Sequence, residues 1–182
     1  SGDIEIMTGS SEYGTAGSII FGVGEATSGD GGDVAIAAGA TSANAATGGT
    51  LTLQGGDGTS PDAQNGGDGG TIVLEGGAAL GRARCDTGGA LIINGGAATH
   101  GTGGSVALQS GAGQTGSSGH VILGTPDAGG DGASGSVSIN TGDALSADSG
   151  QILLATGNSL DGAGGAINLR AGDGDVGDGG DI

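Results

Sequence analysis

The sequence predicts an all-β fold, a parallel β-solenoid of about eleven 15-residue coils that spans residues 1–182 as a single domain. Three observations predict it: a 15-residue period, aliphatic residues at alternate positions in each copy, and glycines at fixed places around each aliphatic pair. Such a period indicates one structural unit stacked on copies of itself. Gly occupies 49 of the 182 positions, a content that indicates low complexity or disorder only where no period is present.

The repeating unit reads Gly-x-aliphatic-x-aliphatic, as in Gly2–Ile6 and Gly32–Ile36. Two aliphatic residues separated by one residue are typical of a β-strand, and both point to the same face. The unit occurs twelve times, and the gaps between successive first aliphatics are 15 residues or close to it, with three longer gaps of 17, 21 and 19. The first aliphatics are Ile4, Ile19, Val34, Leu51, Ile72, Leu91, Val106, Val121, Val137, Ile152, Ile167 and Ile182.

Two glycine positions frame each strand. A leading glycine lies two residues before every first aliphatic, and a trailing glycine lies five residues after it in ten of eleven repeats, with Pro126 as the exception. Because Gly permits positive φ or a close backbone approach, these positions predict the two corners of each coil. The segment between the corners is rich in Gly, Ala and Ser. It predicts a return layer against which the aliphatic ladder packs.

The ends and the longer repeats predict how the chain is organised. Neither end carries an atypical capping repeat, so we expect either a segment of a longer array or a head-to-tail filament unit. No signal peptide opens the chain, so we expect a mature piece or an excised segment. Insertions at 57–68 and 80–85 predict surface loops, and surface loops often carry function.

The charge of the chain limits its partners. It has 20 acidic residues, three basic residues and a net charge of −17. Nucleic acids and anionic membranes attract basic surfaces, so neither is expected as a partner. No apolar run has the length of a membrane-spanning helix, so membrane insertion is not expected. The expected partner is another copy of the chain, bound end to end or side by side.

No catalytic or cofactor site is predicted. His100 and His120 lie in different repeats, Cys85 is the single cysteine, and the absence of Lys excludes a Gly-x4-Gly-Lys phosphate loop. The acidic turn that contains Asp173, Asp175 and Asp178 is similar in composition to calcium-binding nonapeptide repeats, but its period and Asp position differ from theirs. Weak calcium binding at this turn is therefore an alternative to a simple solvated turn.

Five repeats carry a third aliphatic between the first two, and its side chain points to the opposite face of the strand. These residues form a discontinuous apolar stripe along one side of the rod, and they predict a lateral interface between rods. The alternative is that they are scattered surface aliphatics, which are usual on soluble proteins. They are Ile20, Val73, Ile92, Ile122 and Leu153.

Over its entire length the chain resembles the glycine-rich solenoid repeats of large surface and adhesive proteins. The resemblance implies a structural rod or filament segment without catalytic activity, extracellular or at the cell surface. The coil length also resembles that of insect-type antifreeze solenoids, which present flat ladders of Thr. Thr stacks here only in patches, Thr50 with Thr71 and Thr125 with Thr141 and Thr156. Ice binding through a flat face is therefore the alternative function.

Overall fold

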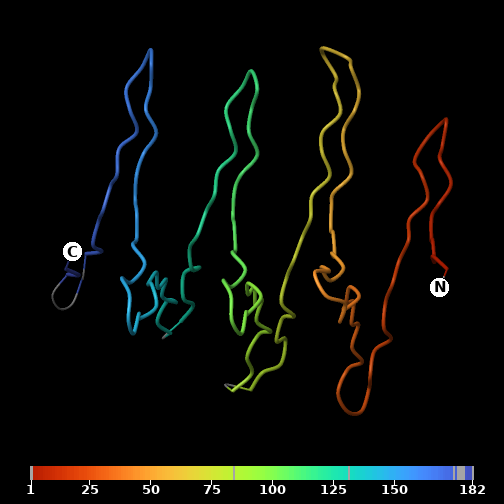
Figure 1. Cartoon of the computed structure of the whole chain (residues 1–182), viewed down its shortest axis with the longest axis horizontal. Coiled ribbons are helices and arrows are strands. Elements are labelled where there is room, and N and C mark those ends of the chain that lie inside the picture. The colour runs from red at the N-terminus through yellow and green to blue at the C-terminus, as the bar shows by residue number, and fades with distance from the viewer. Residues whose placement is uncertain (1, 84, 131, 174, 176–178, 182) are drawn as a thin grey trace. The chain divides into compact units, whose positions relative to one another are not determined.

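The computed structural model describes residues 2–83, 85–130, 132–173, 175 and 179–181. Within these ranges the chain forms no helix and no hydrogen-bonded strand. It runs instead as extended stretches that repeatedly double back, and the two legs of a loop lie close together before they meet at a tip (Figure 1). Successive tips, near Tyr13, Ser28 and Asn44 for example, follow the same spacing as the sequence repeat.

The chain divides into two units, Ser1–Ile93 and Asn94–Ile182. The first contains five loops and the second contains six. In both units the loops begin and end at equivalent positions of the repeat. The 15-residue period therefore has a direct structural counterpart, which is one doubled-back loop per repeat.

This path differs from the coil predicted from the sequence. The leading and trailing glycines do not lie at two separate corners; they face each other across the base of one loop, as at Gly49 and Gly39. The described residues show no β-solenoid, since no ladder of hydrogen bonds joins one repeat to the next. Stacking of the repeats into a parallel solenoid, as one domain over residues 1–182, stays a prediction.

Positive φ values occur at tips and not at the loop bases. Gly14 has a φ of 104° and Gly29 a φ of 102°, and both lie where the chain reverses. Ala45 also has a positive φ, 55°, which for a residue with a Cβ costs about 1–2 kcal/mol. The leading and trailing glycines among the described residues have no positive φ. Close approach of the opposite leg applies at leading glycines, whereas neither positive φ nor close approach explains the trailing glycines.

The chain exposes far more surface than a compact protein. Its accessible surface is 17715 Å², whereas a compact monomer of 16.4 kDa exposes about 7,500 Å² and its unfolded chain about 24,000 Å². No described residue is buried, and three are half-buried: Gly55, Ser110 and Ala171. All three occupy the same position of the repeat, directly before the trailing glycine. The closest packing in each unit is therefore at the loop bases.

Candidate functional site

The bases of the loops are the most regular feature of the structure. We call the residue four positions after each first aliphatic the closing residue, because it lies at the base of the loop opposite the next leading glycine. A Cβ added to Gly49 would lie 3.3 Å from the Cβ of Ala38, and one added to Gly165 would lie 3.2 Å from the Cβ of Thr156. The closing residues are Thr8, Val23, Ala38, Gly55, Gly76, Gly95, Ser110, Thr125, Thr141, Thr156 and Ala171.

The same proximity recurs in every repeat. Each leading glycine from Gly17 to Gly180 has the closing residue or the trailing glycine of the preceding repeat within 4 Å of the place that its Cβ would occupy. A side chain at the leading position would meet these atoms. An added Cβ would lie 2.8 Å from the closing side chain at Gly32 and 2.9 Å at Gly135, which is too close. At Gly17 and Gly180, in contrast, the nearest atoms would be at 3.4 and 3.5 Å. Close approach of the opposite leg therefore favours glycine at several leading positions and not at all of them.

The trailing glycine contributes its carbonyl group. No atom lies within 4 Å of the place that a Cβ would occupy on any of the ten trailing glycines. In six loops its carbonyl oxygen accepts a hydrogen bond from the next leading glycine, and its N–H takes no part in that bond. A residue without an N–H can therefore occupy this position, which accounts for Pro126.

Two kinds of hydrogen bond close the loops. In six of them the N–H of the leading glycine donates to the carbonyl of the trailing glycine, with N···O distances of 2.8–3.1 Å. In three others the hydroxyl of a Thr closing residue donates to the carbonyl of the leading glycine. These bonds join Thr8 to Gly17 at 3.1 Å, Thr125 to Gly135 at 3.2 Å, and Thr156 to Gly165 at 3.1 Å.

The size of the closing residue correlates with which kind of hydrogen bond closes the loop. Every loop with a Gly, Ala or Ser closing residue has the backbone bond, and every loop with a Thr or Val closing residue lacks it. A β-branched side chain places two heavy atoms on Cβ, and these face the leading glycine, as at Thr156, whose Cγ2 would lie 3.3 Å from a Cβ on Gly165. The added bulk keeps the two legs too far apart for the backbone bond. Three of the four Thr closing residues replace that bond with a hydroxyl bond, and the Thr141 and Val23 loops have neither kind of closing bond among the described residues.

Loop length does not change the closure. The longest loop, between Gly56 and Gly70, has the same 2.8 Å backbone bond as the short loop between Gly96 and Gly104. The insertion at 57–68 therefore lies within a closed loop.

The tip of the longest loop is held by Asp62. Its Oδ1 accepts hydrogen bonds from the backbone N–H of Asn65 at 2.7 Å and of Gln64 at 2.9 Å. These bonds favour the charged carboxylate and lower the pKa of Asp62 below its usual 3.8, the bond from Asn65 having the larger effect. The turn is stabilised by the carboxylate above about pH 3.8, and this stabilisation is lost as the pH falls through the lowered pKa.

The pKa shift can be measured by NMR titration. We expect the side-chain carboxyl carbon of Asp62 to titrate below pH 3.8, together with the amide signals of Gln64 and Asn65. In Asp62→Asn, which keeps an acceptor oxygen but has no charge, these amide signals should not titrate in that range. Titration of Asp62 at or above 3.8 would show that the turn does not form in solution.

The residues predicted to bind calcium are only partly described. Asp173 Oδ2 forms an ion pair with Arg170 at 3.2 Å, and both side chains are exposed. Asp175 is described and Asp178 lies outside the described residues. In the described part of the chain no three acidic, His or Cys side chains come together as metal ligands. Calcium binding at this turn stays a prediction.

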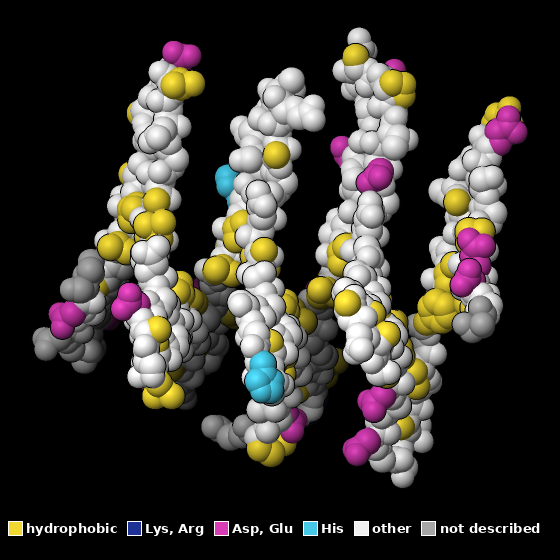
Figure 2. Space-filling model, in the orientation of Figure 1, with side chains coloured by type: hydrophobic (Ala, Val, Ile, Leu, Met, Phe, Trp, Pro, Cys, Tyr) yellow, Lys and Arg dark blue, Asp and Glu magenta, His cyan; other side chains and the backbone are white. Residues whose placement is uncertain are grey.

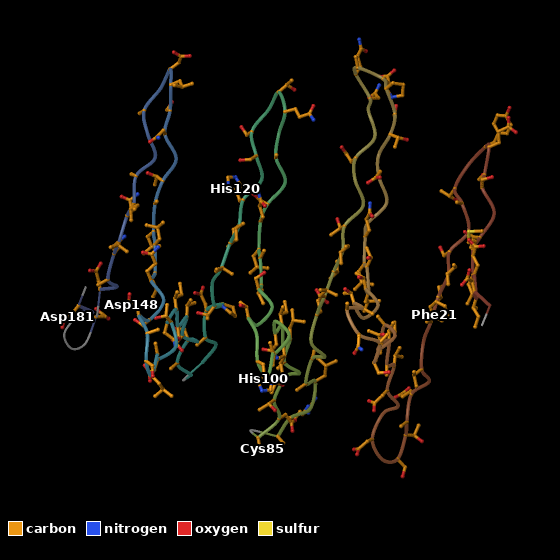
Figure 3. The ribbon with its side chains drawn as sticks, viewed as in Figure 1. Phe21, Cys85, His100, His120, Asp148 and Asp181 are labelled. Atoms are coloured by element: carbon orange, nitrogen blue, oxygen red, sulfur yellow. The ribbon has the colours of Figure 1, made fainter. Side chains whose placement is uncertain are left out.

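The two histidines, His100 and His120, lie at separate positions of the second unit (Figure 3). Cys85 is an exposed free thiol. The structure contains no pocket in the residues that it describes. Over the same residues no helix has the length and hydropathy of a membrane-spanning segment.

The exposure of the aliphatic residues follows the alternation of a strand, although the described residues form no sheet. In each of the five repeats with three consecutive apolar residues, the middle side chain is more exposed than both neighbours. Ile122 is 87% exposed, between Val121 at 55% and Leu123 at 68%. Apolar side chains therefore lie on the surface throughout the visible face, with acidic side chains toward several loop ends (Figure 2).

The spacing of the aliphatic residues does not by itself single out the closing residues as the column that faces the leading glycines. The Thr members at 125, 141 and 156 suggested an ice-binding patch, but in the structure the hydroxyls of Thr125 and Thr156 donate to carbonyl groups within the chain. The signal that could have identified the column is its restriction to Gly, Ala, Ser, Thr and Val opposite an invariant glycine. Ice binding stays a prediction.

Comparisons of this chain with protein-family models, with curated proteins and with solved structures found no match.

Proposed function

We propose that this chain is a non-catalytic structural segment of an extracellular or cell-surface rod or filament, and that it self-associates. The observation that carries the proposal is the exposure of the repeated aliphatic residues. Ile19, Ile72 and Val106 are about half exposed, and equivalent residues recur at the same place in each repeat. Burying one such side chain stabilises by about 1.5–3 kcal/mol, so the array gains stability when further repeats cover it.

The regular loop closure supports the same proposal. Eleven loops have their leading glycine against the preceding closing residue or trailing glycine, so every repeat presents its aliphatic pair in the same local setting. Equivalent surfaces at a constant sequence interval suit stacking of like on like. The extracellular or surface location rests on the resemblance to the repeats of surface and adhesive proteins.

Self-association must overcome electrostatic repulsion, because each chain carries a net charge of −17. Raising the ionic strength from about 0.01 M to about 0.15 M shortens the Debye length from about 30 Å to about 8 Å. We therefore expect the mass measured by sedimentation equilibrium to rise with NaCl concentration, with filaments or oligomers visible by electron microscopy. A chain that stays monomeric at all salt and protein concentrations would contradict the proposed function.

The same measurement separates screening from calcium binding. At matched ionic strength, NaCl and CaCl2 should promote assembly equally if screening alone is responsible. A larger effect of CaCl2 that is lost in the triple variant Asp173→Asn, Asp175→Asn, Asp178→Asn would show that calcium binds at this acidic turn. Equal effects of the two salts would show that the calcium prediction is wrong.

A further inference from the structure

Five repeats carry aliphatic residues on both faces of the strand-like segment. Their sequences are Ile19-Ile20-Phe21, Ile72-Val73-Leu74, Leu91-Ile92-Ile93, Val121-Ile122-Leu123 and Ile152-Leu153-Leu154. The remaining repeats have Glu, Ala, Thr, Ser or Asn at the middle position. Continuous aliphatic runs of this kind are typical of strands that are covered on both faces.

The two faces of these runs differ in solvent exposure. The middle residue is the most exposed of the three in every case: Ile20 is 87% exposed, Val73 66%, Ile92 75%, Ile122 87% and Leu153 77%. The outer two aliphatics belong to the face that every repeat shares. A layer that covers the shared face leaves the middle side chains in water, because successive side chains of an extended segment point in opposite directions.

We propose that the middle aliphatics Ile20, Val73, Ile92, Ile122 and Leu153 form the contact surface for a second copy of this chain. The inference rests on the proposed function and identifies the residues through which copies associate side by side. Each unit carries its own part of the surface, three residues in Ser1–Ile93 and two in Asn94–Ile182.

The exposed area is sufficient for such a contact. The chain exposes 17715 Å², about 10,000 Å² more than a compact monomer of its mass. A standard protein–protein interface buries about 1,600 Å² in total. A contact of standard size would cover a small part of the surplus, and the five middle side chains, each 66% exposed or more, are open to it.

The charge of the chain selects the kind of partner. The five tripeptides contain no charged residue, whereas the chain as a whole carries −17. Membranes with anionic headgroups and nucleic acids are repelled by such a chain. A second copy presents the same uncharged side chains at the same spacing. Because the five tripeptides contain no charged residue, they can associate without burying a charge of their own.

The test compares two double variants of the second unit, each of which removes two exposed aliphatic side chains. Ile122→Ser with Leu153→Ser changes the proposed surface, and Leu145→Ser with Leu160→Ser changes two loop-tip leucines that are 103% and 102% exposed. By sedimentation equilibrium in high salt, the first pair should raise the protein concentration at half-assembly at least tenfold, and the second should leave it unchanged.

The outcomes distinguish the inference from the proposed function. Suppose that the wild-type chain assembles. If both double variants then shift assembly equally, or if Ile122→Ser with Leu153→Ser has no effect, the proposed surface is wrong and the proposed function still stands. A wild-type chain that never assembles would overturn both. Loss of assembly in the first pair alone supports the surface.

Cross-linking provides a second test, because a Ser variant could lose assembly simply by failing to fold. In a Cys85→Ser background, Ile122→Cys should be joined between copies by a short bismaleimide at protein concentrations at which wild-type assembles. Leu145→Cys, at a fully exposed tip, serves as the control. Equal or weaker cross-linking at 122 than at 145 would overturn the proposed contact surface.

Discussion

Val106→Asp combined with Ile152→Asp is expected to abolish both β-sheet formation and assembly of this chain. Each of these first aliphatics is 53% exposed in the isolated chain and lies on the shared face that the proposed solenoid covers completely. A carboxylate buried there without a partner costs more than about 3 kcal/mol per site. Far-ultraviolet circular dichroism and sedimentation of wild-type and variant provide the measurement.

The matched control places the same charge at loop tips. Leu145→Asp with Leu160→Asp adds two carboxylates at positions that are fully exposed, so it should change neither the circular dichroism nor the assembly beyond the effect of the added charge. If the wild-type chain has no β-sheet signal under any assembling condition, the parallel solenoid is wrong. If both pairs of substitutions act equally, net charge and not burial of the shared face controls assembly.

The second large effect is expected at the closing residues. Replacing Gly55, Gly76 and Gly95 together by Val should break three backbone bonds, because loops with β-branched closing residues lack this bond. Each bond contributes about 1 kcal/mol, so the free energy of unfolding should fall by about 3 kcal/mol. Thermal or denaturant unfolding of the assembled chain measures the change.

Two further sets of substitutions show whether side-chain size is the cause. Ala at the same three positions should destabilise less than Val. Its Cβ meets the carbonyl group of the facing leading glycine, so the legs must shift, but the backbone bond is compatible with Ala at positions 38 and 171. Thr, which is nearly isosteric with Val, should recover part of the loss through the hydroxyl bond seen at Thr156. Equal destabilisation by Ala, Val and Thr would mean that loss of glycine alone, and not branching at Cβ, explains the effect.

The repeat could be predicted from the sequence because it is local. The alternation of apolar residues at Ile19 and Phe21, the position of the leading glycines and the placement of the insertions inside single repeats all follow from spacing along the chain. The exposures of the five middle aliphatics agree with the alternation. These features depend only on the geometry of an extended backbone.

The partner of each glycine could not be predicted in the same way. Spacing shows that the trailing and leading positions, occupied by Gly39 and Gly49 in one loop, recur along the chain. It does not show whether the two glycines mark separate corners or face each other. The hydrogen bond between them settles this for the described loop. Likewise, the spacing of Thr125 and Thr156 suggests a column of surface hydroxyl groups. In the structure these hydroxyls donate to the carbonyl oxygens of Gly135 and Gly165. Cross-loop pairing depends on the register, which composition does not specify.

Amide hydrogen exchange of the leading glycines tests the central claim, that the size of the closing residue decides how each loop is closed. The N–H groups of Gly49, Gly104 and Gly119 are hydrogen-bonded, whereas those of Gly17, Gly135 and Gly165 lie opposite Thr and have no backbone partner. A bond of about 1 kcal/mol predicts exchange about fivefold slower or more in the first group. Equal exchange in the two groups would contradict the account.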